Sequence, residues 1–205
     1  CILVEAGDDI YIFDIGNGSA NNIQQYQVQW PNVKGIFITH MHSDHMADLP
    51  DAHLLSWIQG RNAPLKVYGP EGINLVTKGF ELAYSADYQY RNEHHGDEML
   101  PLNISGYDAI TIKGSQVIEN ETPGLEIFSF AVNHQPVNHA FGFKVTYKDR
   151  SIVISGDTIN DGSVQKYSQD VDLLIHSAIS IDLVERLRKI SPIPQLDKIL
   201  LDIQD

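Results

Sequence analysis

The stretch Thr39-His40-Met41-His42-Ser43-Asp44-His45 places four side chains that can bind a metal within six positions. It directly follows residues 34–39, an apolar run typical of a buried strand. In an extended backbone the first two histidines, His40 and His42, point to the same side, so both imidazoles can reach one Zn²⁺. As the chain turns toward a helix, the next two ligands, Asp44 and His45, can face a second point nearby, where another ion could bind. A solvated polar turn rarely holds three imidazoles, so we expect a metal site here.

Two further polar residues follow apolar strands in the same way. His134 comes after the predicted strand 125–132, and Asp157 lies in Gly156-Asp157-Thr158, just past the run 152–154. Sheet-based folds place their sites past the carboxyl ends of strands. Taken alone, His134 would be interpreted as an ordinary loop histidine and Asp157 as a turn residue. Together with the first cluster, we expect them to complete the ligand sphere.

The remaining pattern predicts strands that outnumber the helices, with the helices lying between blocks of strands. The expected strands are 2–5, 10–15, 34–39, 65–68, 108–113, 115–119, 125–132, 140–147, 151–154 and 171–175. The expected helices are 19–29, 46–59, 72–85 and 181–190. This order favours an α/β sandwich, in which two sheets pack face to face with helices outside.

Residues 86–103 show no clear period, and we predict an insertion or lid there. Its polar and aromatic side chains either line a pocket mouth or pack on the surface, and the sequence leaves both interpretations open. These side chains, with one tyrosine just before the segment, are Tyr84, Tyr88, Tyr90, His94 and His95.

Composition and charge limit the partners of this 205-residue chain. A net charge of −13 disfavours broad binding to nucleic acid or an anionic membrane, because such binding depends on Lys and Arg. No apolar run approaches the ~18–20 residues of a membrane span. The one cysteine, Cys1, excludes an internal disulfide and leaves the compartment open. Because the chain opens on a strand without Met, we suspect truncation at both ends.

The spaced motif His40-x-His42-x-Asp44-His45, followed by His134 and Gly156-Asp157-Thr158, resembles the metallo-β-lactamase fold superfamily of metallohydrolases. The resemblance covers nearly the whole chain. The segments Gly69-Pro-Glu-Gly72 and Gly142-Phe143 look most like the branch containing tRNase Z and the zinc-dependent arylsulfatases. The β-lactamases proper differ, since they lack an Asp at position 44 and carry Cys in place of Asp157. The resemblance implies an αββα sandwich of two mixed β-sheets flanked by helices, forming one domain over residues 1–205.

The resemblance also implies a binuclear site that holds two Zn²⁺ ions. Mn²⁺ or Fe²⁺ could replace them. Its metal ligands would be His40, His42 and His134 on the first ion, Asp44 and His45 on the second, and Asp157 bridging both. Two such ions share a water and lower its pKa toward 7, and Asp44 would orient that water or take its proton. Asp14 either fixes a histidine tautomer or is merely a strand-end residue.

One ligand of the family pattern is missing from this chain, and two of its histidines have no settled role. The family's last histidine ligand has no counterpart before residue 205. His176 matches a family histidine, but Ser177 replaces the glutamate that normally follows it. His139 is not a family position.

Three functions compete at this stage. We expect hydrolysis of a small ester, namely a sulfate ester, phosphodiester or lactone, with a small-molecule partner and possible homodimer formation. A tRNase Z-like endoribonuclease is the first alternative. It is disfavoured by the acidic charge and because one hairpin fills the interval between His134 and Asp157, where that family inserts its tRNA-clamping arm. A non-catalytic metal-binding domain is the second alternative.

Overall fold

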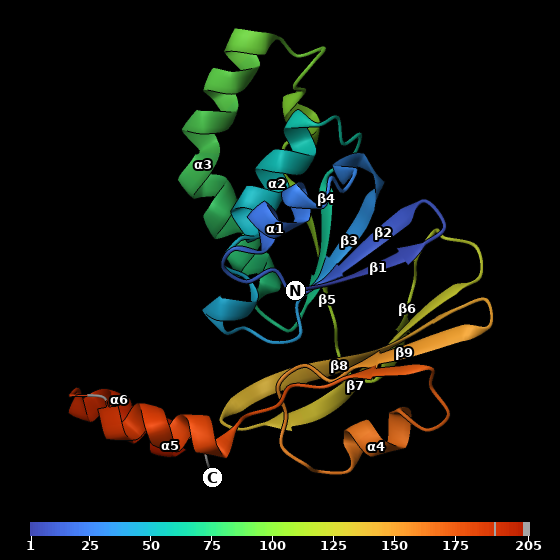
Figure 1. Cartoon of the computed structure of the whole chain (residues 1–205). Helices are drawn as coiled ribbons and strands as arrows, with labels where there is room; N and C mark the ends of the chain where they lie inside the picture. The colour runs from blue at the N-terminus through green and yellow to red at the C-terminus, as the bar shows by residue number, and fades with distance from the viewer. Residues whose placement is uncertain (191, 203–205) are drawn as a thin grey trace. The chain divides into compact units, whose positions relative to one another are not determined.

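A computed structural model describes residues 1–190 and 192–202 (Figure 1). The chain divides into two compact units, residues 1–175 and residues 176–205. The first unit contains both β-sheets, and the second consists of helices.

The first sheet has five strands in the order β1-β2-β3-β4-β5. β1 is antiparallel to β2, whereas β2, β3, β4 and β5 run parallel, so the carboxyl ends of these four strands meet at one edge. The strands are β1 (Ile2–Ala6), β2 (Asp9–Phe13), β3 (Val33–Phe37), β4 (Leu65–Gly69) and β5 (Tyr107–Thr111). Helical segments connect them: α1 (Ser19–Gln25), η1 (Trp30–Asn32), η2 (Ser43–His45), α2 (Leu49–Ile58), α3 (Ile73–His95) and η3 (Leu102–Ile104).

The second sheet also has five strands, in the order β10-β9-β8-β7-β6. β10 is parallel to β9, and the other neighbours are antiparallel. The elements are β6 (Gln116–Ile118), β7 (Leu125–His134), β8 (Val137–Tyr147), β9 (Arg150–Ile154), β10 (Leu173–Ile175) and the helix α4 (Ser163–Tyr167). Two mixed sheets flanked by helices confirm the predicted α/β sandwich.

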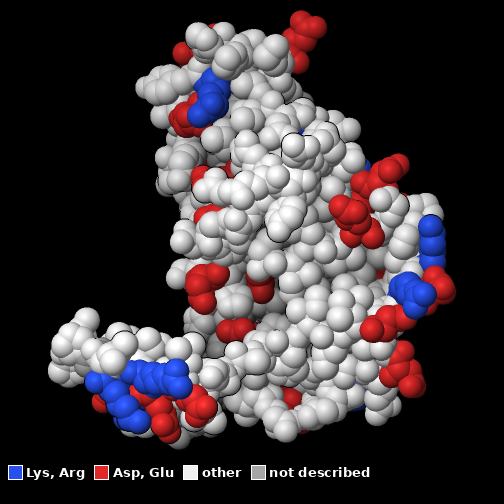
Figure 2. Space-filling view, in the orientation of Figure 1, with Lys and Arg blue, Asp and Glu red and all other residues white. Residues whose placement is uncertain are grey.

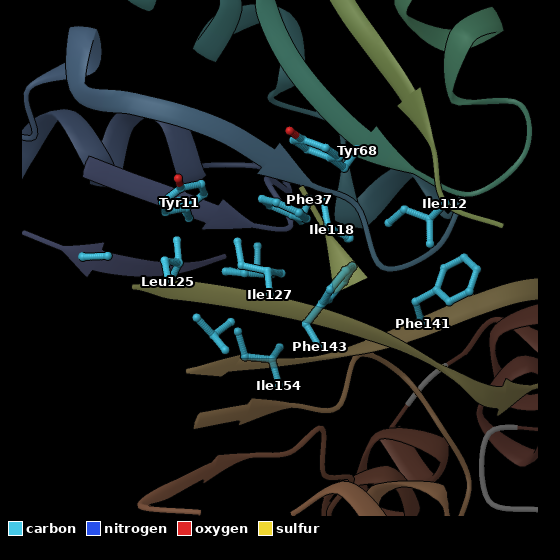
Figure 3. Packing of buried hydrophobic residues seen from close by; sticks show 13 residues of the cluster. Tyr11, Phe37, Tyr68, Ile112, Ile118, Leu125, Ile127, Phe141, Phe143 and Ile154 are labelled. Carbon is cyan, nitrogen blue, oxygen red and sulfur yellow. The ribbon is translucent and has the colours of Figure 1, made fainter. Parts of the chain in front are cut away.

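Aromatic and aliphatic side chains fill the space between the two sheets (Figure 3). Phe37 of β3 stacks on Tyr68 of β4, with ring centroids 4.5 Å apart, and meets Phe143 of β8 edge-on at 5.5 Å. The next residue back, Ile36, faces the opposite way and packs with Leu49 of α2. β3 is therefore buried on both faces, which explains its continuous apolar sequence.

Helix α3 is longer than the sequence indicates. The prediction ended this helix at residue 85, but α3 continues to His95, so residues 86–95 are helical rather than irregular. Tyr88 explains the extension, because it is buried with Trp57 and Leu100 in a small cluster of its own. A buried Tyr88 does not line a pocket mouth, whereas Tyr84 and Tyr90 are exposed. The role of residues 86–103 as a lid stays a prediction.

The second unit consists of α5 (Ile181–Ile190), which matches the prediction, and α6 (Pro194–Asp202). Arg188 of α5 donates a hydrogen bond to Asp197 of α6 at 2.8 Å. On the face shown in Figure 2, Lys and Arg atoms gather over α5. Among the helices in the described part of the chain, none is both long and apolar enough to cross a bilayer.

Candidate metal centre

The histidine-rich segment begins where β3 ends, at the edge where the parallel strands finish. The amide of Ile38 donates to the carbonyl of Tyr68, and the amide of Thr39 donates to Asp14 Oδ1 at 2.8 Å. These bonds hold the backbone extended up to His40, whose side chain is completely buried. His42 is exposed, and η2 then turns the chain so that His45 comes back toward His40. Their ring centroids lie 4.1 Å apart.

The structure brings His134 of β7 onto the two histidines that follow β3. His40 Nε2 and His42 Nδ1 are 2.9 Å apart, and His134 Nε2 lies 3.4 Å from the same nitrogen of His42. A tetrahedral ion bound at 2.0–2.1 Å separates its ligand atoms by about 3.3 Å. These three nitrogens, which come from both sheets, therefore have the spacing that one cation requires.

A second group of ligand atoms lies directly beside the first and consists of His40, His45 and Asp157. His45 Nε2 is 3.4 Å from Asp157 Oδ2 and 3.7 Å from Asp44 Oδ2. An imidazole nitrogen has one lone pair, so His40 can serve only one of two cations. A second cation thus needs a ligand besides His45 and Asp157, and Asp44, whose side chain is 78% exposed, is the candidate on the same side of the His45 ring as Asp157.

Thr39 and Asp14 fix the tautomers of two of these histidines. His45 Nδ1 contacts Asp14 Oδ2 at 2.8 Å, which assigns the proton to Nδ1 and leaves Nε2 free as a ligand. The hydroxyl of Thr39 donates to the same carboxylate oxygen at 3.0 Å, so it accepts from His40 Nδ1 at 2.9 Å. In both rings Nε2 is therefore the nitrogen that faces the cluster and would bind a cation once it has no proton.

Burial and neighbouring charges shift the pKa values of the cluster in opposite directions. Burial, helped by the adjacent histidines, lowers the pKa of His40 to about 4, and burial also lowers the pKa of His134. Burial alone would lower the pKa of His45, but hydrogen bonds with Asp14 and Asp157 raise it to about 10. The hydrogen bond with His45 lowers the pKa of Asp157. A proton and a cation thus compete for His45.

Two glycines allow the segments of the site to approach this closely. A Cβ added to Gly16, just past β2, would lie 1.8 Å from the carbonyl oxygen of Asp44. Gly156 precedes Asp157 with φ +62°, and a Cβ there would meet the carbonyl oxygen of Phe141 at 2.7 Å. The amide of Phe141 in turn donates to the carbonyl of Thr39 at 2.9 Å, which joins the second sheet to the end of β3.

The structure thus assembles the candidate ligands that the sequence indicated, with Asp44 at the rim. Of the two interpretations of Asp14, its contacts support the orienting one. The part played by the Thr39 hydroxyl was missed, because its partner lies 25 residues away and only the folded chain brings the two together. His139 and His176 belong to neither ligand group among the described residues.

The fold and this cluster define a class of protein that typically binds divalent cations at its site. The chain belongs to the metallo-beta-lactamase superfamily, whose family model matches residues 1–196.

The chain is also similar in sequence to individual proteins of known name. The ribonuclease Z of Mycobacterium sp. (strain KMS) is 28% identical over 185 residues, which are 89% of this chain and 63% of that protein. The ribonuclease Z of Mycolicibacterium gilvum (strain PYR-GCK) is 29% identical over 191 residues, with 90% and 64% covered. The chain therefore spans less than two thirds of the length of these relatives.

Two solved structures share the fold. The short form of human tRNase Z matches with a TM-score of 0.65 and 21% identity, over 98% of this chain and 79% of that one. The metallo-beta-lactamase fold protein YhfI from Bacillus subtilis matches with a TM-score of 0.60 and 17% identity, over 84% and 60%.

Proposed function

We propose that this chain hydrolyses phosphodiester bonds in RNA, in the manner that the name ribonuclease Z implies for its relatives. The observation that carries the proposal is the pair of ligand groups meeting at His40, each with its donor atoms within 4.8 Å of one another. The named relatives favour RNA over the small ester that the sequence alone indicated.

The residues of the candidate site would have different roles in this reaction. His40, His42 and His134 would hold one cation, while His45, Asp157 and Asp44 would hold another. Such a cation pair provides an activated water at neutral pH and charge stabilisation for the phosphate. Asp44 would accept the proton of the attacking water at its carboxylate and would return it to the leaving oxygen as the bond between phosphorus and that oxygen breaks. Asp14 and Thr39 would hold the rings of His45 and His40 so that their Nε2 atoms face the site.

The proposal is tested by hydrolysis assays on the full chain loaded with Zn²⁺ or Mn²⁺. The substrates are bis(p-nitrophenyl) phosphate and an RNA oligonucleotide. We expect cleavage of both, loss of cleavage with a chelator, and a fall of at least about 100-fold in His134→Ala. Asp149→Asn, in the exposed turn between β8 and β9, is the control and should retain full activity. Absence of phosphodiester cleavage by a fully loaded wild type would overturn the proposal.

A second candidate, hydrolysis of a small sulfate ester or lactone, has its own support. The interval between His134 and Asp157 is filled by β8 and β9, which pair as a hairpin, and the net charge is −13. Both features disfavour tight binding of RNA. A titration of RNA binding against salt separates the candidates, because each phosphate neutralised by the protein steepens the decline of affinity with salt. A flat response, with turnover of p-nitrophenyl sulfate or a lactone, would favour the small ester.

A further inference from the structure

We propose that His139 contacts the phosphate group of the substrate next to the metal centre, and that Glu71 orients its imidazole. This inference rests on the proposed phosphodiester hydrolysis. Neither residue belongs to the two ligand groups.

His139 lies on β8 at the point where the second sheet reaches the metal centre. Two residues further along β8, the amide of Phe141 donates to the carbonyl of Thr39, which directly precedes His40. Phe141 and Phe143 both pack into the core between the sheets. His139 itself has a positive φ, which interrupts the alternation of side chains along the strand, and it lines the same surface hollow as His134.

The carboxylate of Glu71 lies close to the imidazole of His139. Glu71 lies in the loop between β4 and α3, at the same sheet edge as the histidine cluster, and its Oε2 is 3.9 Å from His139 Nε2. The side chains are 58% and 84% exposed, so both are open to a ligand. With Nε2 facing this carboxylate, Nδ1 is the ring nitrogen that remains for a phosphate oxygen.

The backbone of His139 adds an independent observation. Its φ is +64°, in the left-handed region that is strained for an ordinary residue. The pairing register shifts at this end of the β7–β8 hairpin, between Val132 and His134. Asp14, the other strand-end residue of the site with positive φ, at +54°, uses its side chain to hold two histidines. A histidine at a strained position beside the same centre is consistent with a side chain retained for its chemistry rather than for packing.

The test compares three variants of the full chain: His139→Asn, Glu71→Gln and the control Asp149→Asn, in the exposed turn at the other end of β8. Asn tolerates the left-handed conformation, so the first variant removes the imidazole without adding strain. Each protein is loaded with Zn²⁺, and its metal content, Tm, kinetics on bis(p-nitrophenyl) phosphate and Kd for inorganic phosphate are measured.

We expect His139→Asn to lower kcat/KM roughly 10- to 100-fold and to weaken phosphate binding, chiefly through KM, with metal content and Tm unchanged. Glu71→Gln should give a smaller loss in the same direction, and the control should match the wild type. A kcat/KM and phosphate Kd of His139→Asn within about twofold of wild type would overturn the inference, as would a loss of bound metal. If the wild type cleaves no phosphodiester, the proposed function fails, while phosphate binding still decides whether His139 contacts the anion.

Discussion

Thr39 and Asp14 are not expected ligands, yet they determine where two ligands point. Asp14 accepts from the amide and the hydroxyl of Thr39 and from His45 Nδ1, so one carboxylate serves three donors. Its φ of +54° is tolerated because Asp and Asn adopt the left-handed region more readily than other residues. The site therefore depends on residues behind the ligands as much as on the ligands themselves.

Replacing Asp14 with Asn tests this dependence. The amide side chain keeps the backbone conformation and one acceptor, but it loses the charge that holds the imidazole of His45. We expect metal affinity to fall about 10- to 100-fold, measured by competition with a chromophoric chelator. Asp8→Asn, in the exposed turn between β1 and β2, is the control. An unchanged affinity in Asp14→Asn would show that the contact with His45 does not influence metal binding.

Gly16 provides a steric test of the same region. In Gly16→Ala the new methyl group must displace the backbone at Asp44, from which it would lie only 1.8 Å away. We expect a destabilisation of about 1–3 kcal/mol and weaker metal binding, from urea unfolding and chelator competition. Gly79 lies in α3, and a Cβ added there would meet no other atom within 4 Å. Gly79→Ala should therefore raise the free energy of unfolding by about 0.5–1 kcal/mol. Equal stability of the two variants would contradict the steric argument.

The sequence could indicate the candidate ligands because strand periodicity and ligand chemistry are local properties. His40 and His42 share one side of an extended segment, and such a pattern is visible without a fold. The orienting contact of Asp14 was undecided because it joins residues 31 positions apart. The extension of α3 was missed for the same reason, since Tyr88 is held in the helix by Trp57 of another element.

At the scale of elements, α2 and α3 enclose a buried polar cluster. His53 of α2 is completely buried, and its ring contacts the hydroxyl of Tyr88 at 3.2 Å and the guanidinium of Arg61 at 3.5 Å. Burial, with the charge of Arg61 adding to it, lowers the pKa of His53 to about 3. The histidine is therefore neutral in the folded protein.

This cluster predicts a loss of stability in mild acid. The unfolded chain protonates His53 below its ordinary pKa near 6.5, whereas the folded protein does so only near 3. The free energy of unfolding should thus fall as pH decreases from 6.5 toward 3, by at most about 1.4 kcal/mol per pH unit from this residue.

Urea unfolding at pH 7, 6 and 5 measures this slope for the wild type and for His53→Gln. Because the histidines of the metal centre also titrate, the difference between the two proteins isolates His53. The variant should have the shallower dependence on pH, and parallel curves would contradict the assignment.

At the scale of the whole molecule, the two units differ in how they are built. The hydrophobic clusters between the sheets, beneath the helices and around α4 consist of residues numbered 175 or lower. We therefore expect the fragment 1–175 to fold cooperatively and to bind metal as the full chain does. Thermal unfolding and elemental analysis of the fragment check this. A broad or absent transition would show that residues 176–205 are needed for folding.

The ligands at the candidate metal centre come from opposite halves of the sandwich: His40, His42 and His45 follow β3, whereas His134 ends β7 and Asp157 follows β9 of the facing sheet. A bound cation would consequently fasten the halves together at one end. At a free concentration one hundred times its Kd it would add about 2.7 kcal/mol to the free energy of unfolding. Loss of the cation would then loosen the join between the two sheets, so that the lifetime of the chain in a cell would follow the supply of the metal.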